Sequence, residues 1–356
     1  MSTPWQEFGG RITAALDADP ARVTVVMGAD GSGRTSLLRR LASSPGAGPC
    51  QYVDCEHVTS TPERFLVSLI DDTPFAIPSV ARTPSGPQAA FASLLELLTR
   101  ARRREGGVAT FLFDEWLEIR TFEHFPGLRN VVADLLANVI AGPNRFVLTT
   151  RFVTRALRLF EATSDRVVVL SIPPMGVTDV AADLLHIPGY RSDTAEEFAQ
   201  MILAFTGGRA AYVRAMVDAL GTAPSLGHPI PALLGCLAPD GALDRRCRYT
   251  YEYRLHRARG YGALKAILGI LAGEEPLTLT EIAVRLGRTP GSTRDYLRWL
   301  EDVDLVVTHR KQYAFADPIL RVWVNLFDRP SPPSDEALAA TVQRYALARM
   351  SQPSAP

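Results

Sequence analysis

The stretch Gly28-Ala29-Asp30-Gly31-Ser32-Gly33-Arg34-Thr35-Ser36 decides the fold of this chain. A glycine, four residues, a second glycine, a basic residue and a threonine make the spacing of a phosphate-binding loop, or P-loop. An apolar β-type run at residues 22–27 precedes it, and a helical pattern at residues 35–42 follows. Glycines let the backbone wrap phosphates closely, so that N–H groups and the helix N-terminus bind the oxygens. The stretch therefore predicts a strand, a nucleotide-binding loop and a helix.

Four more short apolar runs follow this loop, separated by helical patterns. Such alternation predicts an α/β domain with a five-stranded parallel sheet and helices on both faces. The expected further strands are residues 50–55, 109–113, 145–149 and 166–171, and the expected helices after residue 42 are residues 91–104, 127–141 and 152–162.

The β signal then disappears, and residues 175–220 read as a small helical lid. A Pro/Gly-rich stretch at residues 221–241 reads as a connection. Three short helices and a hairpin then describe a winged helix-turn-helix: residues 261–272, 279–286 and 290–302, with strands at 306–308 and 313–315. The expected domains are a core at 1–174, the lid at 175–222, a linker at 223–258, the winged helix at 259–328 and a partly disordered tail at 329–356.

Composition excludes several classes of protein. The 38 basic and 38 acidic residues give a formal net charge of zero, which removes the bulk-charge argument for nucleic-acid binding. No apolar run reaches the length of about 20 residues that crosses a bilayer, so no membrane role is expected. Four cysteines, without the spacing of a disulfide framework or zinc site, and the lack of signal-peptide features predict a cytoplasmic location.

Arg34 stands where a P-loop carries lysine. Arginine keeps the charge but is a planar fork on a longer arm. Two interpretations stay open. Lys265 and Lys311 are the only lysines of the chain, so the exchange fits a general preference for arginine that still permits hydrolysis. Alternatively, it marks a site that binds nucleotide and hydrolyses it slowly or not at all.

Two further strand ends carry candidate site residues. Residues 110–113 form an apolar run that ends in Asp114 and Glu115, the form of a Walker B motif. Asp114 is expected to bind Mg²⁺, and Glu115 to activate the attacking water. Residues 145–148 lead to Thr149, Thr150 and Arg151, which are expected to sense the γ-phosphate because ligands of open α/β sheets lie at the carboxyl ends of strands.

The turn between two lid helices, Thr206-Gly207-Gly208-Arg209, adds one more candidate. We predict that the nucleotide contacts Gly28, Asp30, Gly31, Ser32, Gly33, Arg34, Thr35, Ser36, Thr150, Arg151 and Arg209. Mg²⁺ is expected on Thr35 and Asp114, and Glu115 and Arg34 are the expected catalytic residues. An alternative for Arg209 is a plain helix-capping turn.

The order of these motifs resembles the archaeal-type ATPases, within the STAND branch of the AAA-like P-loop ATPases. The stretch Asp317-Pro318-Ile319-Leu320-Arg321-Val322-Trp323 is similar to the Asp-Pro-x-Leu-Arg-x-Trp signature of that family. The resemblance implies ATP or ADP with Mg²⁺ between core and lid, and a conformational switch. Arg34 and the lid turn Gly-Gly-Arg-Ala depart from the family pattern and weaken the expectation of hydrolysis. Origin-recognition-type initiators share a similar core and winged helix and rank second.

The winged helix has two candidate partners. Residues 292, 293, 294 and 298 are placed to face a DNA groove, and Arg310 and Lys311 to touch phosphates. Residues 259–329, however, carry ten basic and nine acidic side chains, which favours docking of a protein over DNA. The sequence thus predicts an ATP-binding, ATP-hydrolysing switch with a winged-helix output. A DNA-binding regulator or initiator and a non-hydrolysing adaptor are the alternatives, and a nucleotide-dependent oligomer is left open.

Overall fold

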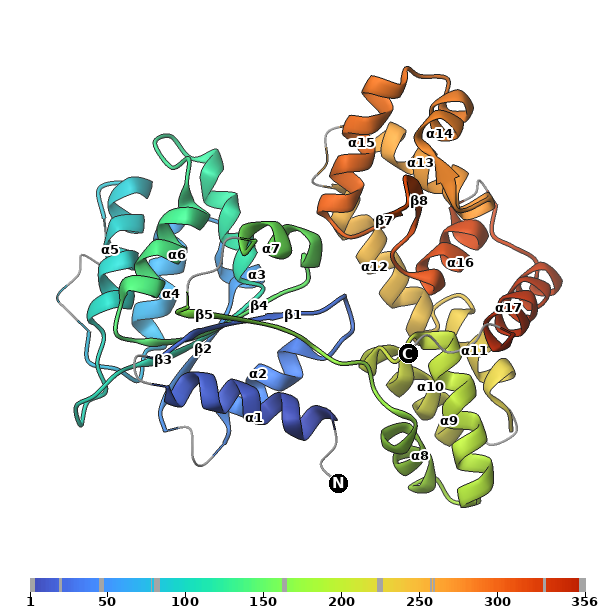
Figure 1. Ribbon diagram of the computed structural model, residues 1–356, viewed down its shortest axis with the longest axis horizontal. Coiled ribbons are helices and arrows are strands. Elements are labelled where there is room, and N and C mark those ends of the chain that lie inside the picture. The colour runs from blue at the N-terminus through green and yellow to red at the C-terminus, as the bar shows by residue number, and fades with distance from the viewer. Residues whose placement is uncertain are drawn as a thin grey trace. The chain divides into compact units, whose positions relative to one another are not determined.

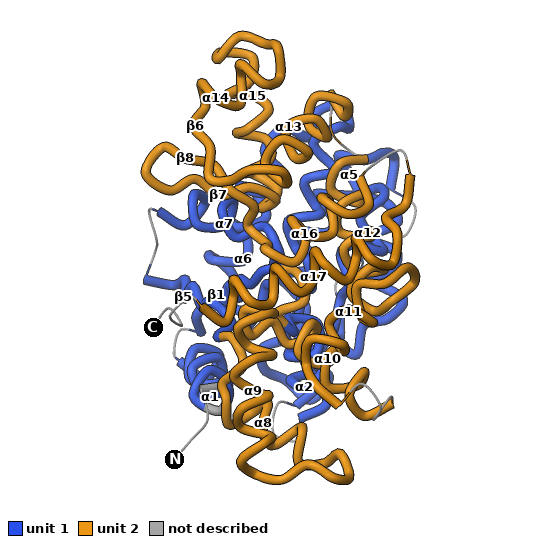
Figure 2. Tube along the Cα trace, turned by 90° about the vertical axis from the view of Figure 1, so that its right-hand side faces the viewer, with its two compact units in different colours: residues 1–29, 33–173 blue, residues 30–32, 174–356 orange. Residues whose placement is uncertain are grey.

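The computed structural model describes residues 4–18, 21–44, 48–77, 79, 84–161, 165–222, 227–256, 258, 260–328 and 331–351. The chain divides into two compact units (Figure 2). Unit 1 comprises residues 1–29 and 33–173, and unit 2 comprises residues 30–32 and 174–356. In the described part, no helix combines the length and the apolar character needed to cross a membrane.

Unit 1 is built on a parallel sheet of five strands in the order β2-β3-β4-β1-β5. The strands are β1 (Val23–Met27), β2 (Cys50–Asp54), β3 (Thr110–Asp114), β4 (Arg145–Thr150) and β5 (Val167–Ser171). The expected five-stranded sheet is thereby confirmed. β1 lies inside the sheet between β4 and β5, although β4 takes the central position. Because β1, β4 and β3 are neighbours and run parallel, their carboxyl ends lie side by side at one edge of the sheet.

Alternating side chains give the sheet two different apolar faces. On one face, side chains of β1, β3, β4 and β5 form a buried cluster with Phe8 and Ile12 of α1 (Pro4–Asp17) and Leu37 and Leu38 of α2 (Arg34–Ala42). The other face is aromatic. The rings of Phe111 and Phe146 stack with their centroids 5.3 Å apart.

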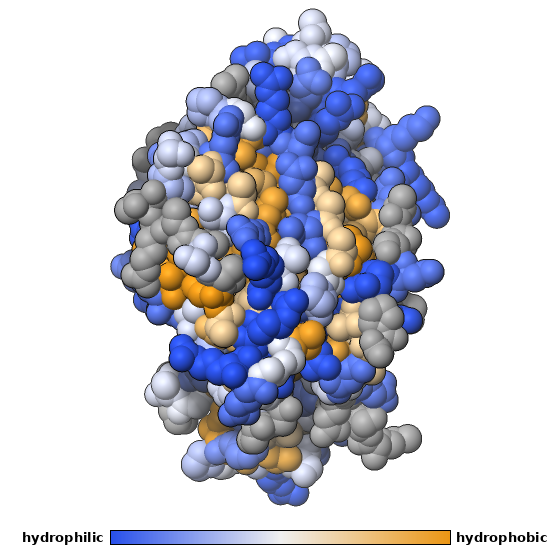
Figure 3. Space-filling view, turned by 90° about the vertical axis from the view of Figure 1, so that its left-hand side faces the viewer, coloured by the Kyte–Doolittle hydropathy of each residue, from blue (hydrophilic) through white to orange (hydrophobic). Residues whose placement is uncertain are grey.

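Helices cover both faces of the sheet. Figure 1 shows α1 and α2 on one face and α4, α5 and α6 on the other. The remaining helices of unit 1 are α3 (Cys55–Val58), α4 (Pro62–Asp71), α5 (Pro87–Arg100), the 3-10 helix η1 (Trp116–His124), α6 (Val131–Ala141) and α7 (Val153–Leu159). Helices α1, α3 and α4 and the 3-10 helix η1 had no counterpart among the sequence-based expectations. On the face of unit 1 seen in Figure 3, hydrophobic residues reach the surface between hydrophilic ones.

Unit 2 begins with the three lid helices that the sequence indicates. These are α8 (Val177–Leu185), α9 (Ser192–Thr206) and α10 (Ala210–Thr222). The expected linker at residues 223–258 is corrected, because its described part forms α11 (Pro229–Leu237) and α12 (Ala242–His256). Pro229 occupies the first turn of α11, where proline is compatible with a helix. On α12, buried Leu243, Cys247, Tyr251 and Leu255 recur at four-residue spacing and form a packed stripe.

The winged helix is present in unit 2 as predicted. It consists of α13 (Tyr261–Gly273), β6 (Leu277–Thr278), α14 (Leu279–Leu286), α15 (Pro290–Asp302), β7 (Val306–His309) and β8 (Gln312–Phe315). The strands form an antiparallel sheet in the order β6-β8-β7. Arg310 and Lys311 alone connect β7 to β8, and both have positive φ angles, of 50° and 65°. Such angles are typical of two-residue hairpin turns.

The chain ends in two helices, α16 (Pro318–Phe327) and α17 (Asp335–Met350). Within the tail expected at residues 329–356, residues 335–350 form α17, and residues 329, 330 and 352–356 lie outside the described part. Leu338, Val342 and Ala346 of α17 are buried. This four-residue spacing places them on one face of the helix, and burial of that face stabilises it.

Candidate phosphate-binding site

The loop after β1 has the geometry that a phosphate-binding loop requires. Gly28 starts it, and its N–H donates to the carbonyl of Thr150 at the end of β4 (3.3 Å). Gly31 and Gly33 have φ angles of 78° and 97°, which non-glycine residues rarely adopt. Helix α2 then begins at Arg34, and no side chain caps its N-terminus. The N–H groups of its first turn are thus suited to bind an anion.

The tip of this loop, residues 30–32, groups with unit 2 (Figure 2). The carbonyl of Gly31 accepts a hydrogen bond from the N–H of Ala211 (2.9 Å). The carboxylate of Asp30 accepts one from the hydroxyl of Thr250 on α12 (2.5 Å). Asp30 therefore has a protein partner that the sequence did not suggest, because Thr250 lies in the segment expected to be a linker.

Arg34 does not extend into solvent. Its guanidinium donates to Glu115 Oε1 from both Nε (3.1 Å) and Nη2 (2.7 Å). Nη1 donates to the carbonyl oxygens of Gly28 and Ala29 at the start of the loop. Arg34 is only 6% exposed, so these contacts form away from bulk water. The fork of the arginine thus ties the loop to the residue that follows β3, which a single ammonium group could not do with the same geometry.

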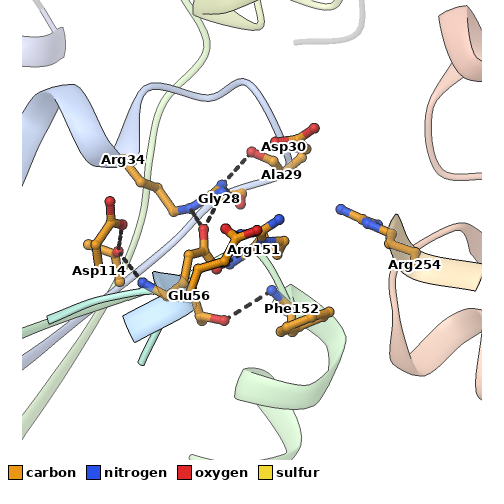
Figure 4. A network of polar contacts seen from close by, with 12 residues as sticks. Gly28, Ala29, Asp30, Arg34, Glu56, Asp114, Arg151, Phe152 and Arg254 are labelled. Atoms are coloured by element: carbon orange, nitrogen blue, oxygen red, sulfur yellow. Dashed lines mark hydrogen bonds and ion pairs between the residues drawn. The ribbon is translucent and has the colours of Figure 1, made fainter. Parts of the chain in front are cut away.

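Glu115 is held between two arginines. Its second carboxylate oxygen, Oε2, accepts a hydrogen bond from the N–H of Arg151 (2.9 Å) and lies 3.1 Å from Arg151 Nε. Arg151 in turn forms an ion pair with Glu56 of α3. Two acidic and two basic side chains therefore alternate along this network, and Figure 4 shows it from close by with Arg34, Arg151 and Glu56 labelled.

The environment of Glu115 acts on its pKa in opposite directions. Burial raises the pKa of the carboxyl, but the charges of Arg34 and Arg151 and the Arg151 N–H outweigh burial and leave the pKa below its usual value. Glu115 also adopts a left-handed backbone conformation, with φ of 54° and ψ of 44°. Non-glycine residues in this region cost about 1–3 kcal/mol and cluster at functional sites.

Asp114 ends β3 and accepts one hydrogen bond at each carboxylate oxygen. Oδ1 accepts from the hydroxyl of Thr149 (2.5 Å), and Oδ2 accepts from the hydroxyl of Tyr52 on β2 (3.0 Å). Each carboxylate oxygen has a second lone pair, so these bonds orient Asp114 without preventing it from binding a cation. Burial, followed by the charge of Asp114, raises the pKa of Tyr52 and keeps its hydroxyl protonated as a donor.

The remaining candidates of unit 1 lie at the same edge of the sheet. Thr150 is fully buried, and its hydroxyl accepts from the N–H of Phe152, at the turn into α7. Thr35 is half-buried and Ser36 exposed, and their hydroxyls have no hydrogen-bond partner among the residues that the structure describes. Thr35 is therefore suited to contact a bound ion.

Arg209 lies in unit 2, where its side chain has two protein acceptors. Its guanidinium binds the carboxylate of Asp317 and the carbonyl oxygen of Ala316 (3.0 Å). Sequence reasoning also missed Tyr52, Glu56 and Thr250 as members of these networks. Tyr52 and Glu56 lie near the carboxyl end of the strand at residues 50–54, so the strand-end rule applied to β3 and β4 would have indicated both.

Comparison with known proteins adds evidence on the fold. No model of a protein family matches the sequence, and no curated protein matches it. Among solved structures, the Walker-type ATPase of Pyrococcus abyssi matches with a TM-score of 0.64 and 17% sequence identity, over 90% of this chain and 95% of that one. This chain shares the fold of that ATPase. The fold implied by the resemblance to archaeal-type ATPases is thus confirmed.

Two structures of origin-recognition proteins match at lower scores. Orc1 of Aeropyrum pernix, solved in complex with DNA, has a TM-score of 0.48 at 16% identity, over 98% of this chain and 95% of that one. A chain of the Drosophila origin recognition complex bound to DNA has a TM-score of 0.42 at 13% identity, over 85% of this chain and 89% of that one.

Proposed function

We propose that this chain is a nucleotide-dependent molecular switch that binds ATP or ADP with Mg²⁺ at the loop after β1 and passes its nucleotide state to a partner. The Arg34–Glu115 ion pair is the observation that carries the proposal. It brings the uncapped start of α2 and the acidic end of β3 together, so N–H donors and carboxylates meet at one point. This combination suits a triphosphate that carries a metal ion.

The residues present fit such a ligand. The N–H groups of residues 31–36 would bind the phosphate oxygens, and Thr35 and Asp114 would hold the ion. Mg²⁺ is commonly bound by one or two carboxylates together with substrate phosphates, and it would neutralise charge on the phosphates here. In the described part of the chain, no cluster of three or more acidic, histidine or cysteine residues forms a separate metal site.

Hydrolysis is restrained by the same network. A general base is most effective with a pKa near the working pH, whereas the pKa of Glu115 is lowered and both of its oxygens face arginines. Glu115 can accept a proton from water only when Arg34 turns away. The phosphates of ATP compete with Glu115 for Arg34, so Glu115 would be free to accept a proton for only part of the time that nucleotide is bound. We therefore propose a slow ATPase, which lies between the hydrolysing and the non-hydrolysing interpretations of Arg34.

Calorimetry with purified protein tests the binding site. Thr35→Ala and Asp114→Asn should each weaken Mg²⁺-dependent ATP binding at least tenfold, because each removes a proposed ligand of the ion. Asp134→Asn, an exposed acid on α6, is the matched control and should bind as the wild type does. If the wild-type protein binds neither ATP nor ADP, the proposed function is wrong.

A second candidate, a DNA-binding regulator, rests on the surface of the winged helix. Arg294 and Arg298 on α15 and Arg310 and Lys311 at the hairpin turn are exposed, as major-groove readout with phosphate contacts requires. Asp295 is exposed on the same helix and opposes this use. Gel-shift titration at two salt concentrations decides between DNA and protein as partner, because phosphate contacts weaken steeply with salt. The absence of a shift even at low salt would exclude DNA.

A further inference from the structure

The stretch 317–323 at the start of α16 carries three polar side chains, and each contacts a different helix of unit 2. Asp317 caps α16, since its Oδ1 accepts from the N–H groups of Ile319 (3.0 Å) and Leu320 (3.3 Å). Its other oxygen, Oδ2, accepts from the hydroxyl of Tyr212 on α10 and from the guanidinium of Arg209. One carboxylate thus joins the first turn of α16 to the lid.

The other two side chains extend this connection. Arg321 donates from Nε to the carbonyl of Ala272 at the end of α13 (3.3 Å) and pairs with Glu275 (3.2 Å). Trp323 Nε1 donates to Asp244 on α12 (2.6 Å), whose side chain is fully buried. Helix α16 therefore holds α10, α12 and α13 at the same time.

The contact of Asp317 is sensitive to loss of a partner. Asp317 is 6% exposed, and its carboxylate pairs with the guanidinium of Arg209, whose side chain is 17% exposed. Removing one partner of such a buried pair leaves an uncompensated charge, which is far more disruptive than losing a surface ion pair. The lid turn is thereby fixed to the start of α16 by charge as well as by packing, and Arg321 of α16 in turn binds the end of α13 in the winged helix.

We infer that Asp317 is a positioning residue that binds Arg209 and Tyr212 and makes the lid and the winged helix one rigid body. Its use in signalling rests on the proposed switch: a change at the lid then moves the winged helix as a whole, with no hinge between them. In this proposal, the polar residues of the 317–323 stretch hold the lid and the winged helix together. Arg209 then has a structural role in addition to any contact with nucleotide.

Distances between spin labels test the inference. Labels on Glu197→Cys in α9 and Asp295→Cys in α15 use exposed positions, in a Cys50→Ser background because Cys50 is the one natural cysteine of the four that is not buried. The full chain should give one narrow distance distribution, unchanged by ATP with Mg²⁺. A broad or divided distribution in this otherwise unaltered protein would overturn the inference without any change at Asp317.

Substitutions at Asp317 and its partners test whether this contact causes the rigidity. Asp317→Asn and Arg209→Ala should broaden the distribution of label distances at least twofold, and Tyr212→Phe should broaden it less. Arg214→Ala, which changes an exposed arginine on the same helix as Tyr212, is the control and should leave the distribution unchanged. Should Asp317→Asn not fold, Arg209→Lys keeps the charge but loses the fork and should still broaden the distribution. An unchanged distribution in the folded Arg209 variants refutes the positioning role.

The result for the rigid body can be distinguished from the result for nucleotide binding. If calorimetry on the same labelled protein detects ATP and the lid-to-winged-helix distance then changes, the inference fails and nucleotide binding stands. If no ATP binds, the proposed function fails, and a narrow distribution that broadens in Asp317→Asn still supports the rigid body.

Discussion

Arg34 Nη2 lies 2.7 Å from Oε1 of Glu115, and both side chains are about 6% exposed. The residue that departs from the P-loop pattern is thus bound directly to the carboxylate expected to activate water. A buried pair of this kind is a poor source of stability but a costly one to break. It therefore acts on the protonation and orientation of Glu115 more than on the stability of the fold.

Arg34→Lys is expected to raise ATP turnover at least tenfold. A lysine cannot bind the loop carbonyls and Glu115 with the same bidentate geometry, so Glu115 becomes available to water while the charge beside the phosphates is kept. Steady-state phosphate release at saturating ATP measures the effect. Arg40→Lys, on the exposed part of α2, is the control and should not change turnover. Equal or lower turnover in Arg34→Lys would show that the arginine does not restrain Glu115.

Glu115→Gln is expected to act on both activity and stability. Turnover should fall at least tenfold while ATP binding persists, because the base is lost and the loop is kept. The free energy of unfolding should also fall, by about 3–5 kcal/mol, since Arg34 and Arg151 then face each other without the intervening charge. Urea unfolding checks the second effect, with Glu105→Gln, an exposed acid, as the control. Undiminished turnover would remove Glu115 from the mechanism.

The lowered pKa of Glu115 gives its ion pairs a defined pH range. Because the pKa in the folded state lies below the value of about 4.3 expected in the unfolded chain, the ionised group stabilises the fold above that value. This contribution is lost as the pH falls through the lower, folded-state pKa. Urea unfolding at several pH values should therefore show the stability advantage of the wild type over Glu115→Gln shrinking as the pH falls below about 4.3. A difference that stays constant or grows on acidification would contradict the assignment.

The sequence predicted the sheet and the winged helix well because both rest on local patterns. Short β-branched runs predict the strands, the glycines predict the loop, and apolar residues three or four positions apart predict α14 and α15. The strands differ from expectation by about one residue at an end, as helix and strand ends commonly do. The rule that ligands lie at the carboxyl ends of parallel strands was enough to predict that Arg34, Asp114, Glu115, Thr149 and Arg151 lie close together.

What the sequence could not show depends on contacts between distant residues. Proline and glycine around residue 229 concealed α11, although proline is compatible with a first helical turn. Arg209 follows two glycines in a turn, which is a setting typical of ligand-binding residues. Only the fold brings it to Asp317, 108 positions away. Whether an arginine binds a phosphate or a buried carboxylate is decided by tertiary packing, which no local pattern records.

Helix α17 is expected to stabilise unit 2 through its buried face. Leu338→Ala should lower the free energy of unfolding by about 2–5 kcal/mol, because Leu338 is 5% exposed and its removal leaves a cavity. Leu347→Ala on the same helix is the matched control and should change the stability by no more than about 0.5 kcal/mol, since Leu347 is 50% exposed. The hydroxyl of Tyr345 and the guanidinium of Arg349 also bind the last carbonyls of α9, at Phe205 and Ala204 (2.6 and 2.9 Å). If α17 did not pack against unit 2, Leu338→Ala and Leu347→Ala would change the free energy of unfolding equally. The packed helix requires the two changes to differ.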